Sequence, residues 1–393
     1  MTPASKRDVA LFAVLAAAAA ALALARPDKA IDFRVYWENT RHYFGGGAAM
    51  YGPASGTGWA GGVYRYPPIF LDLFRPLARL PLRWGAAMWA AGQLACAGAL
   101  AIELRRRWQL PSVLAAFPAL LLLAPYAIQE LRYGNVQLYI VVLACAAFVA
   151  AERHPGWGGL GLGLAAALKV WPLFFFPCLA VQRRWRMLAA ALGFGAGFTL
   201  APALWRGWSA QWTLLGQWLG QERAIAATSA SWGELWYPGQ SLHDVLARYL
   251  TRIDYSRLAD AAYPQIAWLR LSPAALDRVW WIAAALVLGG MFALLWRARA
   301  ASDASVALMC CGVVVLEPHV HRLILVTLLW PALYLAAALR RGKLQGWQRA
   351  LFWFAVAASV LEPLVPGSGR QRALQVYGAD FWLVVLPVTA VVA

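Results

Sequence analysis

The stretch GWGGLGLGLAAALKVWPLFFFPCLAV, residues 156–181, is long and apolar enough to cross a membrane, yet Lys169 and Pro172 lie near its centre. A helix that spans a bilayer needs about 20 mostly apolar residues. Proline interrupts a helix, and a charged lysine in the hydrocarbon core costs free energy. The stretch therefore predicts two half-length helices, 157–168 and 171–182, that meet at a break inside a membrane protein.

The rest of the chain has the same character. Apolar residues make up 62% of the 393 residues and charged residues only 13%, whereas soluble domains are about half apolar and a quarter charged. We therefore expect an all-α integral membrane protein, with a single polytopic domain over residues 1–393 and about twelve transmembrane segments, some short or broken. The other expected segments are 8–25, 84–104, 111–128, 136–151, 187–205, 277–296, 304–317, 322–339, 349–365 and 376–392.

Basic residues predict the orientation. If the chain alternates at these segments, the short basic turns, such as 105–107, 183–186 and 340–343, all fall on one side, and such turns stay cytoplasmic. Both termini are then cytoplasmic, and the long loops 26–83 and 206–276 lie on the outer face. These loops are rich in Trp and Tyr, and residues 31–44 can form a helix at the membrane interface. The first segment also resembles a signal peptide.

The net charge of +17 allows two interpretations. The arginines set topology and contact lipid headgroups, or those of the outer face hold an anionic substrate such as a lipid phosphate. The outer-face candidates are Arg34, Arg41, Arg65 and Arg223. No basic run is long enough to indicate nucleic acid, and the five cysteines lie within expected spans, where they read as small core residues.

Asp32 is the first candidate for chemistry on the outer face. On a helix it shares a face with Tyr36, because the two are four residues apart. A partly desolvated carboxylate accepts a proton more readily. A topological or capping aspartate is the alternative, and Asp28 or Glu38 could serve in its place.

Lys169 is the second candidate. It lies at the expected helix break, where backbone ends face a cavity instead of lipid, and charges inside a membrane usually have a function. Alternatively, its ammonium reaches the outer headgroups.

The segment LEPHVHRLILVTLLWP, residues 316–331, is the third. Glu317, His319, His321 and Arg322 gather at the outer end of two apolar runs. The two histidines could bind zinc only with Glu317 as a third ligand. A proton carrier or phosphate contact is favoured, and polar capping of the loop stays open.

Two further outer segments are polar where lipid would not favour polarity. QELRYGNVQ, residues 129–137, contains Asn135 and Gln137. The segment 233–250 contains Gln240 and Ser241, and Ser241 also suits a helix N-terminus.

These residues suggest one reaction. Phosphate leaves a sugar readily once Lys, Arg or His meets its charge. A single carboxylate then suffices to take a proton from an acceptor hydroxyl. Nucleotide-sugars are cytoplasmic, so a site on the outer face implies a lipid-carried donor, and aromatic rings suit sugar faces and polyprenyl chains.

Several motifs, in order and spacing, carry a family resemblance. They are DFRVYW from Asp32, YRYPPIFLDLFRPLARLP from Tyr64, GNVQLYIVVLACAAFVAAER from Gly134, GLGLGLAAALKVWPLFFFP around Lys169, GQSLHDVLARYL from Gly239 and EPHVHRLILVTLLWP from Glu317. Over nearly the whole chain to about residue 340, the sequence resembles the bacterial polyprenyl-phosphate-mannose-dependent alpha-(1-2)-mannosyltransferases, glycosyltransferase family 87 of the GT-C superfamily.

The resemblance implies a GT-C fold with interfacial helices in the outer loops. It also implies metal-independent, inverting transfer of a sugar, expected to be mannose, from a polyprenyl phosphate to a lipid or glycan acceptor, without a cofactor. It places the enzyme in a bacterial inner or plasma membrane with the active site outside. Asp32 occupies the place of the catalytic base, Lys169 that of a donor-phosphate lysine, and His319 and His321 that of a polar motif at an outer helix end. The substrate-binding residues expected beside them are Arg34, Tyr36, Tyr64, Tyr66, Asn135, Gln137, Gln240, Ser241 and Arg322.

Two motifs depart from the family pattern. Many relatives carry Gly-Gln-x-Asn where this chain has Gly134-Asn135-Val136-Gln137, and many carry Asn-Gln-Ser where it has Gly239-Gln240-Ser241. These departures concern the identity of the sugar and acceptor more than the fold. The competing hypotheses are a transporter or flippase of lipid-linked sugars, which a lysine at a helix break also suits, and a non-catalytic scaffold.

Overall fold

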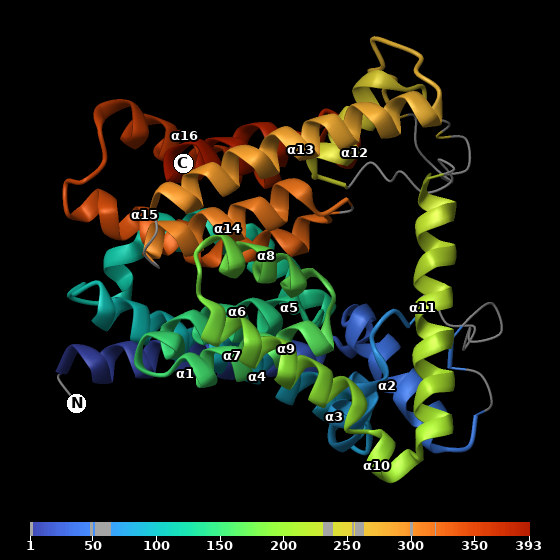
Figure 1. The fold of residues 1–393 in the computed structure, drawn as a ribbon. Coiled ribbons are helices and arrows are strands. Elements are labelled where there is room, and N and C mark those ends of the chain that lie inside the picture. Colours follow the sequence, from blue (N-terminus) through green and yellow to red (C-terminus); the bar gives the residue numbers. More distant parts are fainter. Residues whose placement is uncertain are drawn as a thin grey trace. The chain divides into compact units, whose positions relative to one another are not determined.

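The computed structural model describes residues 3–47, 50–51, 64–230, 239–253, 255, 263–298, 302–318 and 320–393, without the side chains of 3–5 and 226–230. Regular structure in these ranges is helical, and they contain no strand (Figure 1). The prediction of an all-α protein is therefore confirmed. Backbone contacts divide the chain into two units, each of which is described by itself. This division leaves the prediction of a single polytopic domain untested.

The first unit comprises Met1–Arg107, Glu130–Ala180 and Arg184–Ala226. Its helices are α1 (Pro3–Ala25), the 3-10 turn η1 (Pro27–Lys29), α2 (Ile31–Phe44), α3 (Pro68–Ala78), α4 (Leu82–Arg107), α6 (Gln137–Arg153), α7 (Pro155–Leu168), the 3-10 turn η4 (Trp171–Phe174), α8 (Phe175–Val181), α9 (Trp185–Leu200), α10 (Ala203–Arg206) and α11 (Trp208–Ala230). Chemistry-bearing residues of the first outer loop and of the Lys169 break both belong to this unit.

The second unit comprises Trp108–Gln129, Val181–Arg183 and Ala227–Ala393. Its helices are η3 (Val113–Ala116), α12 (Leu242–Leu250), α13 (Pro273–Ala298), α14 (Asp303–Leu316), η5 (Arg322–Leu328), α15 (Leu329–Arg340), α16 (Gly346–Leu361), η6 (Glu362–Leu364), α17 (Ser368–Val376), the π-helical turn η7 (Phe381–Val385) and α18 (Leu386–Val392). Helix α5 (Phe117–Tyr133) begins in this unit, and its last turn, from Glu130, belongs to the first. The ends of α8, at Val181, and of α11, from Ala227, are likewise assigned to the second unit.

Each predicted membrane segment coincides with a helix, and the break at Lys169 is confirmed. α7 ends at Leu168, Lys169 has extended backbone angles, and η4 begins at Trp171. The number of spans is a separate matter. Among the described residues, six helices are long and apolar enough to cross a membrane, or seven if the bent pair Ser368–Val376 and Phe381–Val392 counts as one. The prediction of about twelve transmembrane segments is not confirmed.

Glycine determines how α7 packs, and therefore where Lys169 emerges. A Cβ at Gly159 would lie 2.3 Å from the Cβ of Ala190 on α9, and one at Gly158 would lie 2.4 Å from the Cβ of Ala151 on α6. Small residues let helix backbones approach closely in membrane proteins. α7 is therefore held between α6 and α9, and its C-terminal end delivers Lys169 to the start of α6.

The long outer loops contain helices in both predicted places and in two that we did not predict, α3 and α11. α2 matches the expected helix at 31–44, and Ser241 is the N-cap of α12, as expected. α11, of 23 residues, lies within the loop 206–276, where only Ser241 had suggested a helix start. Its Gln221 donates to the carbonyl oxygen of Tyr64, and Trp218 to that of Arg65, so α11 packs on the segment before α3.

Candidate functional site

Asp32 lies in the first turn of α2 and is partly buried. The two aromatic residues that share this part of the helix anchor it. Phe33 is fully buried with its ring centre 5.3 Å from that of Phe74, and Tyr36 packs edge-on against Phe70 at 5.2 Å. Aromatic pairs at such distances stabilise beyond their burial. The packing of α2 on α3 therefore sets the position of the Asp32 carboxylate.

Asn135 donates a hydrogen bond to Asp32, from Nδ2 to Oδ2 at 2.8 Å. It lies in the turn between α5 and α6, where Gly134 has φ +67°. A Cβ at Gly134 would lie 2.7 Å from the Cβ of Phe33, so only glycine lets the turn approach α2 this closely. The turn thus brings an amide donor to a carboxylate 103 residues away.

Lys169 joins the same network through Gln137. The Oε1 atom of Gln137 accepts hydrogen bonds from Lys169 Nζ at 2.7 Å and from Trp171 Nε1 at 3.1 Å. The backbone N–H of Gln137 donates to Asn135 Oδ1 at 3.0 Å. Asp32, Asn135, Gln137 and Lys169 therefore form one hydrogen-bonded chain, which we call the Asp32–Lys169 chain. Four residues that the sequence predicted separately are brought together.

Burial raises the pKa of Asp32 above its ordinary value, and the Asn135 hydrogen bond and the charge of Lys169 oppose that shift. Desolvation disfavours the ionised form, while a nearby cation and a donated hydrogen bond favour it. The Asp32 carboxylate is consequently more basic than a solvated one, and it still faces a cation. These are the properties of a proton acceptor in a site that also binds an anion.

Tyr36 and Tyr66 lie beside the Asp32–Lys169 chain and contact each other. Their hydroxyl oxygens are 2.8 Å apart, and Lys169 Nζ lies 6.0 Å from the centre of the Tyr66 ring. Burial raises the pKa of both tyrosines well above the ordinary value, so both are neutral. Tyr66 is only partly buried, unlike Tyr36, and therefore offers a ring face beside the cation. Tyr64 is buried behind it, with ring centres 5.8 Å apart.

Arg34 forms an ion pair with Glu38, Nε to Oε1 at 2.7 Å. Both side chains are partly exposed on α2. Glu38, an alternative base in the sequence, is thus paired with a cation. The other alternative, Asp28, is exposed beside Arg26 and Lys29. Of these three acidic residues, Asp32 is therefore the one that is hydrogen-bonded in the Asp32–Lys169 chain.

Sequence reasoning missed two buried polar residues behind the network. Glu130 is fully buried at the end of α5 and accepts hydrogen bonds from Leu138 N and Gln93 Nε2. Gln93, on α4, also donates to the carbonyl oxygen of Asn135 at 2.6 Å. A signal existed, because the polar segment 129–137 that stood out in the sequence includes Glu130. Gln93 lies alone in an apolar helix and gave no comparable pattern.

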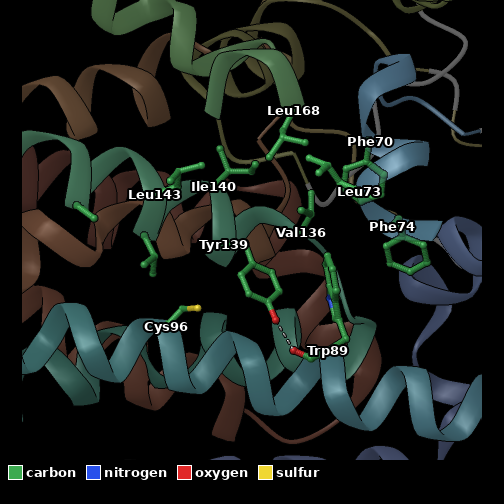
Figure 2. Close-up of a pocket in the computed structure, with 12 residues that line it drawn as sticks. Phe70, Leu73, Phe74, Trp89, Cys96, Val136, Tyr139, Ile140, Leu143 and Leu168 are labelled. Atoms are coloured by element: carbon green, nitrogen blue, oxygen red, sulfur yellow. Dashed lines mark hydrogen bonds between the residues drawn. The ribbon is translucent and has the colours of Figure 1, made fainter. Parts of the chain in front are cut away.

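An apolar cavity of about 320 Å³ adjoins the Asp32–Lys169 chain (Figure 2). Val136, between the two amide residues, and Leu168, next to Lys169, both line it. Figure 2 shows Phe70, Leu73 and Phe74 of α3 on one side and Tyr139, Ile140 and Leu143 of α6 on the other. Trp89 and Cys96 of α4 contribute to the lining, and the Tyr139 hydroxyl donates to the Trp89 carbonyl oxygen at 2.9 Å. The cavity suits a hydrocarbon chain.

The remaining predicted residues lie in the second unit. Gln240 and Ser241 are fully buried. Gln240 Nε2 donates to the Gln375 carbonyl oxygen, while Ser241 caps α12 by accepting from Asp244 N at 3.1 Å. These contacts hold the fold around α12, and their expected substrate contacts stay predictions.

Arg322 lies between two carboxylates of the second unit. It pairs with Glu362 and, from Nε, with Asp380 Oδ2 at 2.9 Å, and Tyr126 donates to Asp380 at 2.9 Å. His321 is exposed at the start of η5, and His319 lies outside the described residues. The proposed roles of all three stay predictions.

The described ranges contain no group of three or more His, Cys, Asp or Glu side chains that could hold a metal ion. The alternative zinc site depended on His319, which is outside those ranges. The side-chain N–H donors in and beside the Asp32–Lys169 chain are the Asn135 amide, the Trp171 indole and the Lys169 ammonium, groups that bind anions and not metal ions.

A family model matches more than half of the chain. The family model described as glycosyltransferase family 87 matches residues 64–318. No solved structure matches the chain. The matched range contains Asn135, Gln137 and Lys169, whereas Asp32 precedes it and Arg322 follows it.

Proposed function

Because this chain belongs to glycosyltransferase family 87, we propose that it transfers a sugar from a polyprenyl phosphate to a lipid or glycan acceptor on the outer face of the membrane. Membership makes it a glycosyltransferase, and its apolar helices make it a multi-pass membrane protein. Our proposal adds the donor, the side of the membrane and the mechanism. Mannose is the expected sugar on the resemblance alone.

The observation that carries the proposal is the Asp32–Lys169 chain. It joins a carboxylate with a raised pKa to an ammonium through two amides. A base for the acceptor and a cation for the leaving group are what a direct displacement at the anomeric carbon requires. The other carboxylate nearby, Glu130, is fully buried and accepts backbone and amide hydrogen bonds, so it is less suited to meet an acceptor.

In the proposed reaction, the acceptor hydroxyl gives its proton to Asp32 as its oxygen attacks the anomeric carbon. The bond from that carbon to the phosphate oxygen breaks, and its electron pair leaves with the polyprenyl phosphate. Lys169 stabilises the charge that develops on the phosphate. One displacement inverts the anomeric configuration, and the residues that supply it need no metal ion.

The cavity supports a lipid-linked donor. Its lining is apolar, and it adjoins Lys169 through Leu168. A phosphate held at Lys169 would leave the first isoprene units of its chain next to this surface, where burial of hydrocarbon is favourable by about 25 cal/mol per Å². A nucleotide-sugar has no apolar group that would occupy such a cavity.

The test uses purified protein in lipid nanodiscs with a labelled polyprenyl-phosphate mannose and a membrane-lipid extract as acceptor. We expect a new glycoside with inverted configuration, and we expect Asp32→Asn to lower the rate about 10²- to 10⁴-fold, the usual contribution of a general base. Asp28→Asn, which changes an exposed aspartate four residues away, is the matched control. Full activity in Asp32→Asn would remove Asp32 as the base.

The transporter hypothesis makes a different prediction in the same assay. Broken helices also form the binding sites of transporters, and α7 and η4 form such a break. A flippase would move the labelled lipid between leaflets of a proteoliposome and form no glycosidic bond. Formation of the bond therefore separates the two functions, and donors that differ in their sugar then identify the preferred substrate.

A further inference from the structure

We propose that Glu130 and Gln93 are positioning residues, which hold Asn135 so that its amide donates to Asp32. The inference rests on the proposed role of Asp32 as the base. Neither residue touches Asp32 in the hydrogen bonds described above. Their effect on catalysis would pass through the turn that carries Asn135.

Glu130 fixes this turn from two sides. Its backbone oxygen accepts hydrogen bonds from Gly134 N at 2.9 Å and Asn135 N at 3.3 Å, and its Oε1 atom accepts from Leu138 N at 2.8 Å. The first N–H groups of a helix have no intrahelical partner, and an acceptor there stabilises the helix start. One residue therefore closes α5, shapes the turn and caps the first turn of α6.

Gln93 fixes the other backbone group of Asn135. Its Nε2 atom donates to the Asn135 carbonyl oxygen at 2.6 Å and to Glu130 Oε1 at 3.3 Å. Both side chains are 0% exposed, so water does not compete for these bonds. The Asn135 N–H is thus bound by the main-chain oxygen of residue 130, which any residue would supply, and its C=O by Gln93. The Glu130 side chain contributes by holding Gln93 Nε2 and Leu138 N, the first on one side of Asn135 and the second on the start of α6.

The side-chain orientation of Asn135 follows from this backbone. Its Oδ1 atom accepts from Gln137 N at 3.0 Å, and a backbone N–H can only donate. The Nδ2 atom must therefore point the other way, where it meets Asp32. If the turn loosens, Asn135 loses this orientation, and Asp32 loses the hydrogen bond that favours its ionised form.

The charge of Glu130 could also affect the protonation of Asp32, so the test must separate charge from position. The ionisable groups that interact with Asp32 are Lys169, Glu130, Tyr36 and Tyr66, and Lys169 attracts both carboxylates. Glu130→Gln keeps an oxygen acceptor and removes the charge, whereas Glu130→Ala removes both. If Glu130 acts by positioning, only the alanine variant should make Asp32 easier to protonate.

The experiment measures the protonation of Asp32 by infrared titration of the protein without substrate, with the band assigned by its loss in Asp32→Asn. We expect Asn135→Ala and Glu130→Ala each to raise the titration midpoint by about one unit, a tenfold change in proton affinity. We expect Glu130→Ala to add no further rise when Asn135 is already Ala. Glu130→Gln should not raise the midpoint.

The proposal is overturned if Glu130→Ala titrates like the wild type while Asn135→Ala shifts. An equal shift from Glu130→Ala with and without Asn135 would also overturn it. Gln93→Ala provides the same test if Glu130→Ala does not fold. Its control is Gln211→Ala, since Gln211 is another fully buried glutamine that donates to a backbone oxygen, that of Thr199.

The titration separates this proposal from the proposed function. It needs no donor or acceptor, so it can succeed even if no transfer is found. Once transfer is measured, the acid limb of its pH profile should move with the infrared midpoint in each variant, while the KM for the donor changes little. A loss of activity with an unmoved acid limb would indicate a structural role only and would contradict the proposal.

Discussion

Lys169 is a charged residue at the break after α7, and its neighbours fix the position of its ammonium. A charged lysine inside an apolar span costs roughly 2.5–3.5 kcal/mol on insertion scales, and the chain places one where α7 ends. Its ammonium is bound by Gln137 Oε1, and Trp171 donates to the same oxygen. Because the indole N–H and the ammonium only donate, the Gln137 amide has one possible orientation. Lys169 is thereby held beside the cavity, and its charge acts on the Asp32 carboxylate.

Replacing Lys169 by Gln should have two effects. The developing charge of the leaving phosphate loses its cation, so kcat should fall about a hundredfold or more, as when one oxyanion donor is removed. The charge of Lys169 lowers the pKa of Asp32, so its loss raises that pKa and moves the acid limb of activity to higher pH. Steady-state kinetics across pH measure both effects. Lys343→Gln, at an exposed lysine, is the control. Wild-type kcat in Lys169→Gln would contradict the assignment.

At the scale of elements, the turn between α5 and α6 carries the site. It places Asn135 against α2 and starts α6 at Gln137, so the donor to Asp32 and the acceptor for Lys169 are two residues apart on one rigid structure. Gly134 makes the approach possible because its φ is positive and because Phe33 fills the space where a side chain would be. The packing of α2 on this turn is therefore a condition for the network.

Gly134→Ala tests that packing, and the chain supplies a matched control. Gly342, which follows α15, has φ +66° and no atom within 4 Å of an added Cβ, whereas Gly134 has φ +67° and Phe33 at 2.7 Å. Both alanine variants carry the strain of a left-handed residue, about 1–2 kcal/mol, but only Gly134→Ala displaces α2. We expect both to lower the thermal unfolding midpoint, Gly134→Ala by more, and only Gly134→Ala to lower transfer strongly. Equal losses of activity would show that strain, not the position of α2, matters.

At the scale of the whole molecule, the predicted membrane orientation rests on the distribution of charge. The short turns predicted to be cytoplasmic contain Arg153 and Lys343, and both side chains are exposed. The predicted outer loop 206–276 contains the exposed Ser209 at the start of α11.

Several apolar helices, such as α6 with 17 residues and α14 with 14, are shorter than a standard span. Their inner faces are buried in protein, where short or broken helices are tolerated.

The orientation can be measured by labelling single cysteines with a membrane-impermeant maleimide in intact cells and in inverted vesicles. Arg153→Cys and Lys343→Cys should react only in inverted vesicles, and Ser209→Cys only in intact cells. Cys96, which is exposed in the structure, is replaced first to avoid background labelling, and the other four native cysteines are buried. Labelling of Ser209→Cys and Lys343→Cys from the same side would overturn the predicted orientation and the outer-face site.

The sequence by itself determined most of the helices and the chemistry available to them. Apolar runs of sufficient length, the proline and lysine at the α7 break, the α2 segment and the Ser241 cap are local features, and local features set secondary structure. The order of the motifs also indicated the family, and the family model matches residues 64–318. α11 was missed because its sequence mixes polar and apolar residues without a clear helical stripe, so nothing local distinguished it from the rest of the outer loop.

Only the tertiary structure decided which side chains meet. Asp32 and Asn135 are 103 residues apart in the chain, and Gln93 and Asn135 are 42 apart. The sequence grouped Arg322 with the anion-binding residues, yet the structure pairs it with Glu362 and Asp380. Periodicity specifies the face of a helix, but a hydrogen bond requires two particular atoms within about 3 Å. That proximity depends on how helices pack, which here is set by Gly134 and by the aromatic rings of α2 and α3.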